Sequence, residues 1–187
     1  CAPENDLYPL LPLNKDNKFW YYAPDGKWGA EVINEQGQSP KVRIVNRFGY
    51  EKYYQYNPVM FTQTSLKVFP RFWTQDRRYF FVNILPGDFD IQETPFTNSI
   101  GLQRISIDDG KVSYMFSGVA GQEYAYTMSE DGKKIVYVRQ GDQPLKITFK
   151  DTYSEDEKTV TLALPNNGTG TYVSAGSITW SVDEQTA

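Results

Sequence analysis

The sequence contains no histidine and only one cysteine among its 187 residues. Without histidine, the chain has no Ser-His-Asp or Cys-His catalytic set, no imidazole metal ligand and no histidine general base. A single cysteine excludes an intrachain disulfide and a zinc site built from several thiolates. These two absences remove the commonest hydrolase and zinc chemistries. A lysine nucleophile or a pair of carboxylates remains as a formal catalytic option.

The sequence also lacks a basic stripe and a long apolar run. Its formal net charge is −4, whereas nucleic-acid binding needs clustered positive charge, so nucleic acid is not an expected partner. No stretch approaches the ~18 consecutive apolar residues of a membrane-spanning helix. No stretch keeps a 3.6-residue apolar period for more than about two turns, so we expect little helix.

Aromatic and β-branched residues are abundant instead. Apolar residues make up 40% of the chain and aromatic residues 16%, and these residue types favour strands. The 11 prolines and 14 glycines separate short apolar runs, which is typical of many tight turns. The length and the apolar content suit one all-β domain with a sizeable core.

A short pattern recurs along the sequence at a nearly constant interval. A large residue stands three positions before an aspartate, a small residue stands two positions before it, and an apolar strand follows the turn. The copies are Tyr22-Ala23-Pro24-Asp25, Trp73-Thr74-Gln75-Asp76, Met128-Ser129-Glu130-Asp131 and Trp180-Ser181-Val182-Asp183. The aspartates are 51, 55 and 52 residues apart, and each interval holds four short strand-like segments. A four-stranded antiparallel meander repeated at roughly 40 to 55 residues is typical of a β-propeller blade.

The pattern resembles the TolB-like and WD40-like blade repeat, and Pro24-Asp25-Gly26 is the copy most similar to its core. The resemblance implies an antiparallel β-propeller over residues 15–187 and leaves the activity open, because propellers host unrelated functions. We expect blades at about 15–66, 67–119 and 120–173, and the start of a fourth at 174–187. Such a partial propeller predicts that the chain is the N-terminal part of a longer protein. A β-sandwich is the alternative if the polypeptide ends at Ala187.

The repeated aspartates are interpreted as structural turn residues and not as ligands or catalysts. An aspartate in a tight turn accepts backbone N–H bonds, and a glycine beside it supplies a positive φ. The large residue at the end of the preceding strand is expected to pack between neighbouring blades. This interpretation covers Asp25, Asp76, Asp131 and Asp183.

The one cysteine is residue 1, and a polar, proline-containing segment follows it to residue 14. This start resembles the mature N-terminus of a bacterial lipoprotein, where a signal peptide is cut before a cysteine that then carries diacylglycerol and often an acyl chain. The resemblance implies lipid on Cys1 and anchoring on the periplasmic or extracellular side of the envelope. Ala2 after the cysteine resembles lipoproteins sorted to the outer membrane. Several acyl chains anchor firmly, at roughly 0.8 kcal/mol per buried CH₂. An arbitrary chain start with a free thiol is the alternative.

Acidic clusters and arginine–aromatic stretches are the remaining candidate sites. Calcium loops combine a glycine bend with a terminal bidentate acid, and the acidic clusters here do not, so no metal site is predicted. Asp88 and Asp90 would be the first choice for a cation. Arginine alternates with aromatic residues in 46–56 and 69–81, a pattern that suits blade packing or a binding interface. The candidate interface residues are Arg71, Arg77 and Arg78.

The sequence therefore predicts a non-enzymatic, lipid-anchored envelope protein whose propeller is an interaction scaffold or an accessory subunit of a membrane-associated assembly. No nucleophile elbow, P-loop or dinucleotide motif occurs, and no cofactor other than the covalent lipid is expected. The expected partners are envelope proteins. One alternative is a propeller that binds a glycan or another small ligand. The other is the propeller half of a prolyl-oligopeptidase-like hydrolase.

Overall fold

The computed structural model describes residues 20–33, 41–46, 48–55, 66–86, 99–118, 122–142 and 144–162. The candidate residues Cys1, Asp88, Asp90 and Asp183 lie outside these ranges. The described residues form strands and turns, and none of them belongs to a helix that could cross a membrane.

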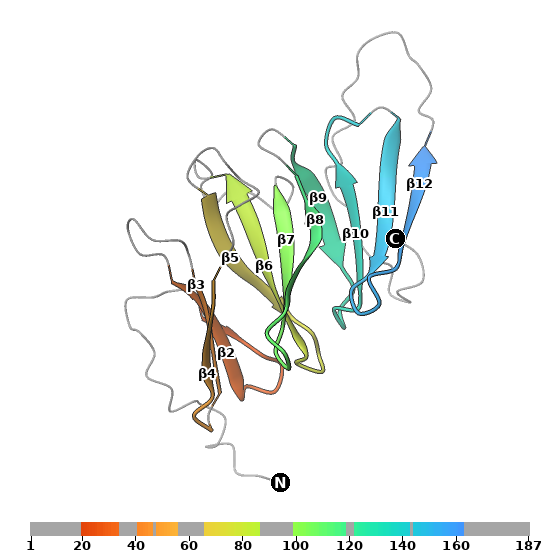
Figure 1. Cartoon of the computed structure of the whole chain (residues 1–187). Coiled ribbons are helices and arrows are strands. Elements are labelled where there is room, and N and C mark those ends of the chain that lie inside the picture. The colour runs from red at the N-terminus through yellow and green to blue at the C-terminus, as the bar shows by residue number, and fades with distance from the viewer. Residues whose placement is uncertain are drawn as a thin grey trace.

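Three four-stranded antiparallel sheets make up the described structure, and each is a simple meander (Figure 1). Sheet 1 contains β1 (Trp20–Tyr22), β2 (Trp28–Ile33), β3 (Lys41–Asn46) and β4 (Glu51–Gln55). Sheet 2 contains β5 (Leu66–Trp73), β6 (Tyr79–Pro86), β7 (Gly101–Ser106) and β8 (Val112–Ser117). Sheet 3 contains β9 (Tyr124–Met128), β10 (Lys134–Arg139), β11 (Leu145–Asp151) and β12 (Glu157–Leu162).

The sheets stand side by side in chain order, each packing a face against the next (Figure 1). Sheet 2 therefore buries both of its faces, one against sheet 1 and the other against sheet 3. A β-sandwich has only two sheets, each with one buried face. The fold is all-β, with repeated four-stranded meanders arranged as three blades of a partial β-propeller. The prediction of this fold class is confirmed.

Strand β6 shows how one strand serves two cores. Successive side chains of a strand point to opposite faces, and Phe80, Val82 and Ile84 face sheet 1 while Phe81 faces sheet 3. All four side chains are fully buried. This explains why β6 is an almost continuous apolar run, whereas a strand with one solvent-facing side alternates apolar and polar residues.

Each inter-sheet core is built from apolar side chains of two neighbouring sheets. Between sheets 1 and 2 the buried residues include Ala30, Val32, Ile44, Tyr54, Val68, Trp73, Phe80, Ile84 and Ile105. Between sheets 2 and 3 they are Phe81, Leu102, Met115, Phe116, Tyr126 and Ile135. The second core is rich in rings, since Phe116 lies 4.8 to 5.3 Å, centroid to centroid, from Tyr124, Tyr126 and Tyr137.

Candidate functional site

The turn between the first and second strand of each sheet contains one of the repeated aspartates. In every described copy the carboxylate accepts the backbone N–H of the residue two positions later. This bond closes the turn as an Asx-type turn. The donors and acceptors are Lys27 to Asp25 (3.0 Å), Arg78 to Asp76 (3.1 Å) and Lys133 to Asp131 (2.9 Å).

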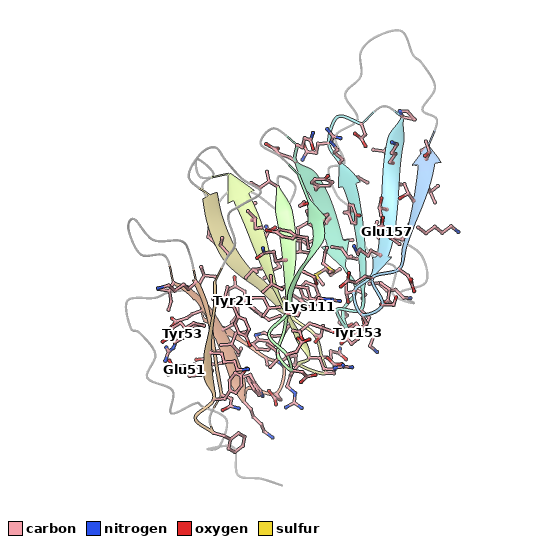
Figure 2. All side chains as sticks on the ribbon, viewed as in Figure 1. Tyr21, Glu51, Tyr53, Lys111, Tyr153 and Glu157 are labelled. Carbon is pink, nitrogen blue, oxygen red and sulfur yellow. The ribbon has the colours of Figure 1, made fainter. Side chains whose placement is uncertain are left out.

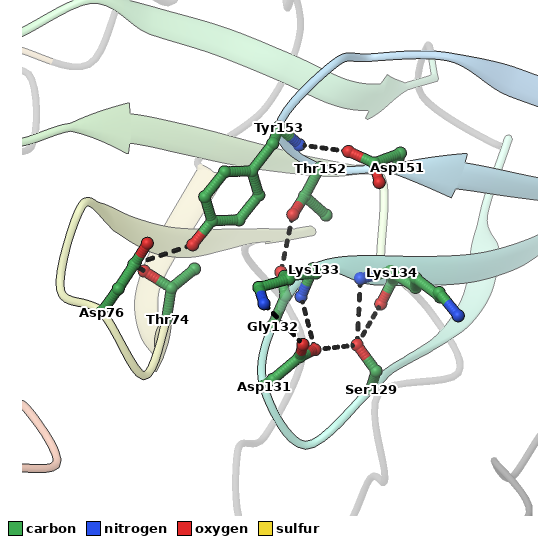
Figure 3. Close-up of polar contacts among 10 residues, drawn as sticks. All are labelled: Thr74, Asp76, Ser129, Asp131, Gly132, Lys133, Lys134, Asp151, Thr152 and Tyr153. Atoms are coloured by element: carbon green, nitrogen blue, oxygen red, sulfur yellow. Dashed lines mark hydrogen bonds and ion pairs between the residues drawn. The ribbon is translucent and has the colours of Figure 1, made fainter. Parts of the chain in front are cut away.

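The small residue two positions before the aspartate adds bonds in sheets 2 and 3. The Ser129 hydroxyl donates to Asp131 Oδ1 at 2.8 Å and accepts the Lys134 N–H at 2.9 Å (Figure 3). Thr74 does the same for Asp76 and Tyr79, at 2.7 and 3.1 Å. One hydroxyl thus connects the turn aspartate to the start of the second strand. Sheet 1 has Ala23 at this position and lacks that link.

The residue after each aspartate adopts a left-handed backbone conformation. Gly26 and Gly132 have φ values of 65° and 75°, and Arg77 has φ 64° at the corresponding position of sheet 2. A non-glycine residue there costs roughly 1–2 kcal/mol. The Arg77 guanidinium pairs with Asp25 of sheet 1 at 2.5 Å. Arg77 thus adopts an unfavourable backbone conformation, and its side chain joins two neighbouring sheets.

A second inter-sheet bond involves the Asp76 carboxylate. The Tyr153 hydroxyl, from the β11–β12 turn of sheet 3, donates to Asp76 Oδ1 at 2.7 Å (Figure 3). Burial alone would raise the pKa of Asp76, but bonds from Thr74, Tyr153 and the Arg78 N–H outweigh it, so the pKa lies below its usual value. Burial and the bond to Asp76 raise the pKa of Tyr153 to about 12. The aspartate is therefore ionised and the tyrosine neutral at pH 7.

These bonds predict acid-sensitive stability. The pKa values of both Asp76 and Asp131 are lowered in the folded chain, so the unfolded chain takes up protons first as the pH falls. Their contribution is complete above the unfolded pKa of ~3.9 and is lost as the pH falls through the folded pKa. Melting temperatures measured between pH 7 and pH 3 should fall steeply at the acid end. The Asp76→Asn variant should show a smaller fall, and the exposed control Asp156→Asn should keep the wild-type slope.

Arg104 on β7 makes the most buried charged contact between sheets 2 and 3. Its guanidinium donates to the backbone carbonyl of Thr152 and to the carboxylate of Glu155, both in the β11–β12 turn. The guanidinium carbon also lies 4.5 Å from the ring centroid of Tyr79. One buried arginine therefore engages a carbonyl, a carboxylate and an aromatic face at this interface.

The three arginines predicted for an interface make contacts within the molecule. Arg71 lies over the ring of Tyr126 in sheet 3, at 5.9 Å, and Arg77 pairs with sheet 1. Arg78 lies 3.6 Å from Asp108 and also approaches two tyrosine rings. Most rings of 69–81 pack between the sheets, as the blade-packing interpretation predicts. They are Phe72, Trp73, Tyr79, Phe80 and Phe81. No group of three or more potential metal ligands occurs in the part of the chain that the structure describes.

In the other arginine–aromatic stretch, residues 46–56, the described side chains of Phe48 and Tyr53 are exposed. Four of the seven large exposed hydrophobic side chains in the described ranges belong to sheet 1 or its β3–β4 turn. They are Tyr21, Tyr22, Phe48 and Tyr53. Phe48 and Tyr53 are 73% and 54% exposed, which is unusual for large aromatic residues. The sequence contained this signal, but its local pattern does not separate an exposed face from a packed one.

A hydrogen-bonded network holds Tyr53 in place on the face of sheet 1 that points away from sheet 2 (Figure 2). The Tyr53 hydroxyl donates to Glu51 at 2.9 Å, and Arg43 donates to Glu51 at 2.7 Å and to Glu31 at 2.9 Å. Glu31 is only 2% exposed. Because a buried carboxylate anchors the network, Glu51 and Tyr53 present a pre-organised polar and aromatic surface, and the Arg43 side chain that joins them to Glu31 is only 16% exposed. We call Tyr22, Arg43, Glu51 and Tyr53, together with Phe48 in the adjoining turn, the aromatic face.

Comparisons with known proteins show likeness in structure only. No family model and no curated protein matches the sequence. TolB from Acinetobacter baumannii is 19% identical, with a TM-score of 0.42 over 76% of this chain and 31% of TolB. A prolyl endopeptidase is 14% identical, with a TM-score of 0.46 over 78% of this chain and 22% of the endopeptidase. A conserved lipoprotein from Clostridium novyi NT is 14% identical, with a TM-score of 0.40 over 81% of this chain and 91% of the lipoprotein.

The chain thus spans about a third of the TolB structure and about a fifth of the endopeptidase. At these identities and TM-scores, the activities, partners and locations of those proteins cannot be inferred for this chain. The fold assignment rests on the three sheets themselves and on their packing.

Proposed function

We propose that the chain is a non-enzymatic, lipid-anchored protein of the bacterial cell envelope, with its propeller blades acting as an interaction scaffold. The lipid anchor rests on the resemblance of Cys1 and segment 1–14 to a mature lipoprotein start. The scaffold role rests on the aromatic face. The partner is a protein of the same envelope, with apolar groups for the rings and hydrogen-bonding groups for Glu51 and Arg43.

The observation that carries the scaffold proposal is the combination of exposure and rigidity at the aromatic face. Tyrosine and arginine are enriched where proteins bind each other, and they contribute most when they are already fixed in place. Tyr53 and Arg43 are fixed by Glu51, which bonds to both. By contrast, Asp25, Asp76 and Arg77 are engaged in turns and inter-sheet bonds. Their bonding supports a structural role and not a catalytic one.

Removal of the aromatic face is expected to abolish partner capture. The protein would be cross-linked in native membranes, extracted in detergent and purified with its partners. In a separate preparation without cross-linking, its intact mass would show whether Cys1 is acylated. The double variant Phe48→Ser/Tyr53→Ala should lose at least about tenfold of the envelope protein recovered with wild type, since two interface anchors contribute over 1 kcal/mol each. Val112→Ser, at an exposed position of sheet 2, is the matched control. Equal recovery with both variants, or no envelope protein with wild type, would refute the scaffold role.

A glycan-binding role is the second candidate, and the same network supports it. An exposed tyrosine ring beside a fixed carboxylate and guanidinium can stack on a sugar ring and bond its hydroxyls. Peptidoglycan fragments that quench tryptophan fluorescence in wild type, and not in Tyr53→Ala, would favour this role. In that case protein capture would not depend on the aromatic face.

A further inference from the structure

One polar side chain is enclosed in the apolar core between sheets 2 and 3. Asn83 of β6 lies opposite Phe69 of β5 and Leu102 of β7. Leu102 in turn lies opposite Phe116 of β8. Residues opposite one another share a face of the sheet, and Phe81, two positions before Asn83, packs toward sheet 3. The Asn83 amide therefore belongs to an otherwise apolar row that faces sheet 3, and it is 0% exposed.

The Asn83 amide has no hydrogen-bond partner among the residues that the structure describes. This holds for its oxygen and for its nitrogen, and both atoms are buried. A buried polar atom that loses water and gains no other partner destabilises the fold, so such atoms almost always bond to protein or to water. An apolar residue of the same shape would fill this place in the row without that penalty. The amide at this position therefore indicates a ligand.

A second buried polar group lies at the same end of this interface. The Ser99 hydroxyl is buried and has no hydrogen-bond partner within the described ranges. Ser99 and Tyr124 exchange backbone bonds of 3.1 and 2.7 Å, which join the chain just before β7 to β9 of sheet 3. The next residue, Ile100, donates its N–H to the carbonyl of Ile84 at 2.9 Å. Because Ile84 follows Asn83 directly, the two buried groups lie near each other.

Tyr126 of β9 adds a phenol to the same region. Burial raises the pKa of this phenol to about 12, while the charge of Arg71 and the nearby Ser99 hydroxyl act in the opposite direction. The Tyr126 ring lies 5.3 Å, centroid to centroid, from the ring of Phe116. Tyr126 therefore packs on the row that contains Asn83, and its phenol is neutral at pH 7.

We propose that the Asn83 amide and the Ser99 hydroxyl bind a small cluster of buried water between sheets 2 and 3. The ligand has to donate and to accept hydrogen bonds, because an amide presents N–H donors beside a carbonyl acceptor and a hydroxyl does both. An anion would satisfy only the donors, and a cation only the acceptors. The complete burial of both residues excludes a larger polar solute. Buried water typically makes about three hydrogen bonds to such groups.

Bound water gives the interface a second directional contact. Arg104, further along β7, supplies the first through its bond to the Thr152 carbonyl. The apolar contacts between these two places are non-directional, so bonds at both places restrict the rotation of sheet 3 on sheet 2. This inference does not rest on the aromatic face, which belongs to sheet 1.

A crystal structure of the full chain, at a resolution that shows ordered water, tests the proposal directly. We expect a water oxygen at roughly 2.7–3.2 Å from the Asn83 amide, connected to the Ser99 hydroxyl directly or through a second water. Asn83→Leu keeps the branched shape of the side chain and should lose this water. Gln103→Met is the matched control and should keep it. Gln103 is a buried amide of β7 that lies opposite Val82, on the face toward sheet 1.

Thermal unfolding provides a second test in solution. Ser99→Ala should lower the Tm of the wild-type chain by roughly 2–4 °C, because one buried hydrogen bond is lost. In the Asn83→Leu background the same change should lower the Tm by less than half as much, because the water that bonds to Ser99 is already gone. In the Gln103→Met background Ser99→Ala should keep its full effect.

Three results would overturn the proposal. The first is a wild-type crystal structure in which Asn83 contacts only protein atoms. The second is an anomalous signal beside Asn83 after soaking in bromide, which would assign the site to an anion. The third is an equal Tm loss for Ser99→Ala in the wild-type and Asn83→Leu backgrounds, which would show that the two residues share no ligand. Partner capture through Phe48 and Tyr53 is measured separately, so failure of either proposal leaves the other standing.

Discussion

Replacing Phe81 with alanine is expected to lower the free energy of unfolding by about 3–5 kcal/mol. Phe81 is fully buried between sheets 2 and 3, and its ring centroid lies 6.5 Å from that of Phe72. Alanine removes the ring and leaves a cavity. The backbone cannot close this cavity, because β6 is hydrogen-bonded to β5 on one side and to β7 on the other. Urea unfolding followed by circular dichroism measures the loss.

Phe80 supplies the matched comparison, because it precedes Phe81 in the chain and faces the opposite core. Its ring packs on Trp73 at 4.9 Å, between sheets 1 and 2. Phe80→Ala should therefore cost a similar ~3–5 kcal/mol, because its ring is equally buried in the other core. Val112→Ala, on the exposed side of β8, should cost less than about 1 kcal/mol. A loss below about 1 kcal/mol for either phenylalanine would show that its sheet is not packed against a neighbour.

The repeat could be predicted from the sequence because its signals are local. The turn aspartate, the hydroxyl two positions before it and the strand after it stand within about ten residues of one another, as at Ser129 and Asp131. Alternation of side chains then fixes which residues of β6 face each core. These local signals account for the three meanders and for their antiparallel pairing.

The contacts between sheets could not be predicted in this way. Tyr153 bonds to Asp76 across 77 residues, and Arg77 bonds to Asp25 across 52 residues. No spacing rule pairs such residues before the sheets are placed. The sequence indicated stretch 46–56 as packing or interface, but it could not predict which of its rings are exposed. Tyr53 and Tyr54 are adjacent and chemically identical, yet one is exposed and the other lies in the core, because neighbouring residues of a strand point to opposite faces.

Arg104→Met is expected to lower the free energy of unfolding by about 2–4 kcal/mol, which makes it the largest single polar effect. Methionine keeps much of the volume but leaves the buried Thr152 carbonyl without its partner, and a hydrogen bond to a charged group contributes ~1.5–3 kcal/mol. The contact of the guanidinium with the Tyr79 ring adds to the loss. Glu155 is 40% exposed, so water can solvate its carboxylate and its share of the loss is small.

The variants of Arg104 also separate geometry from charge. Arg104→Lys keeps the charge but cannot bond the Thr152 carbonyl and the Glu155 carboxylate with one planar group, so it should recover less than half of the loss. Arg139→Met, which breaks the exposed pair with Asp142, should change stability by less than about 0.5 kcal/mol. Full recovery by lysine would mean that charge alone accounts for the contribution of Arg104 to this interface. Partial recovery means that the fork of the guanidinium adds to it, because only a group that reaches both acceptors fixes the β11–β12 turn against β7.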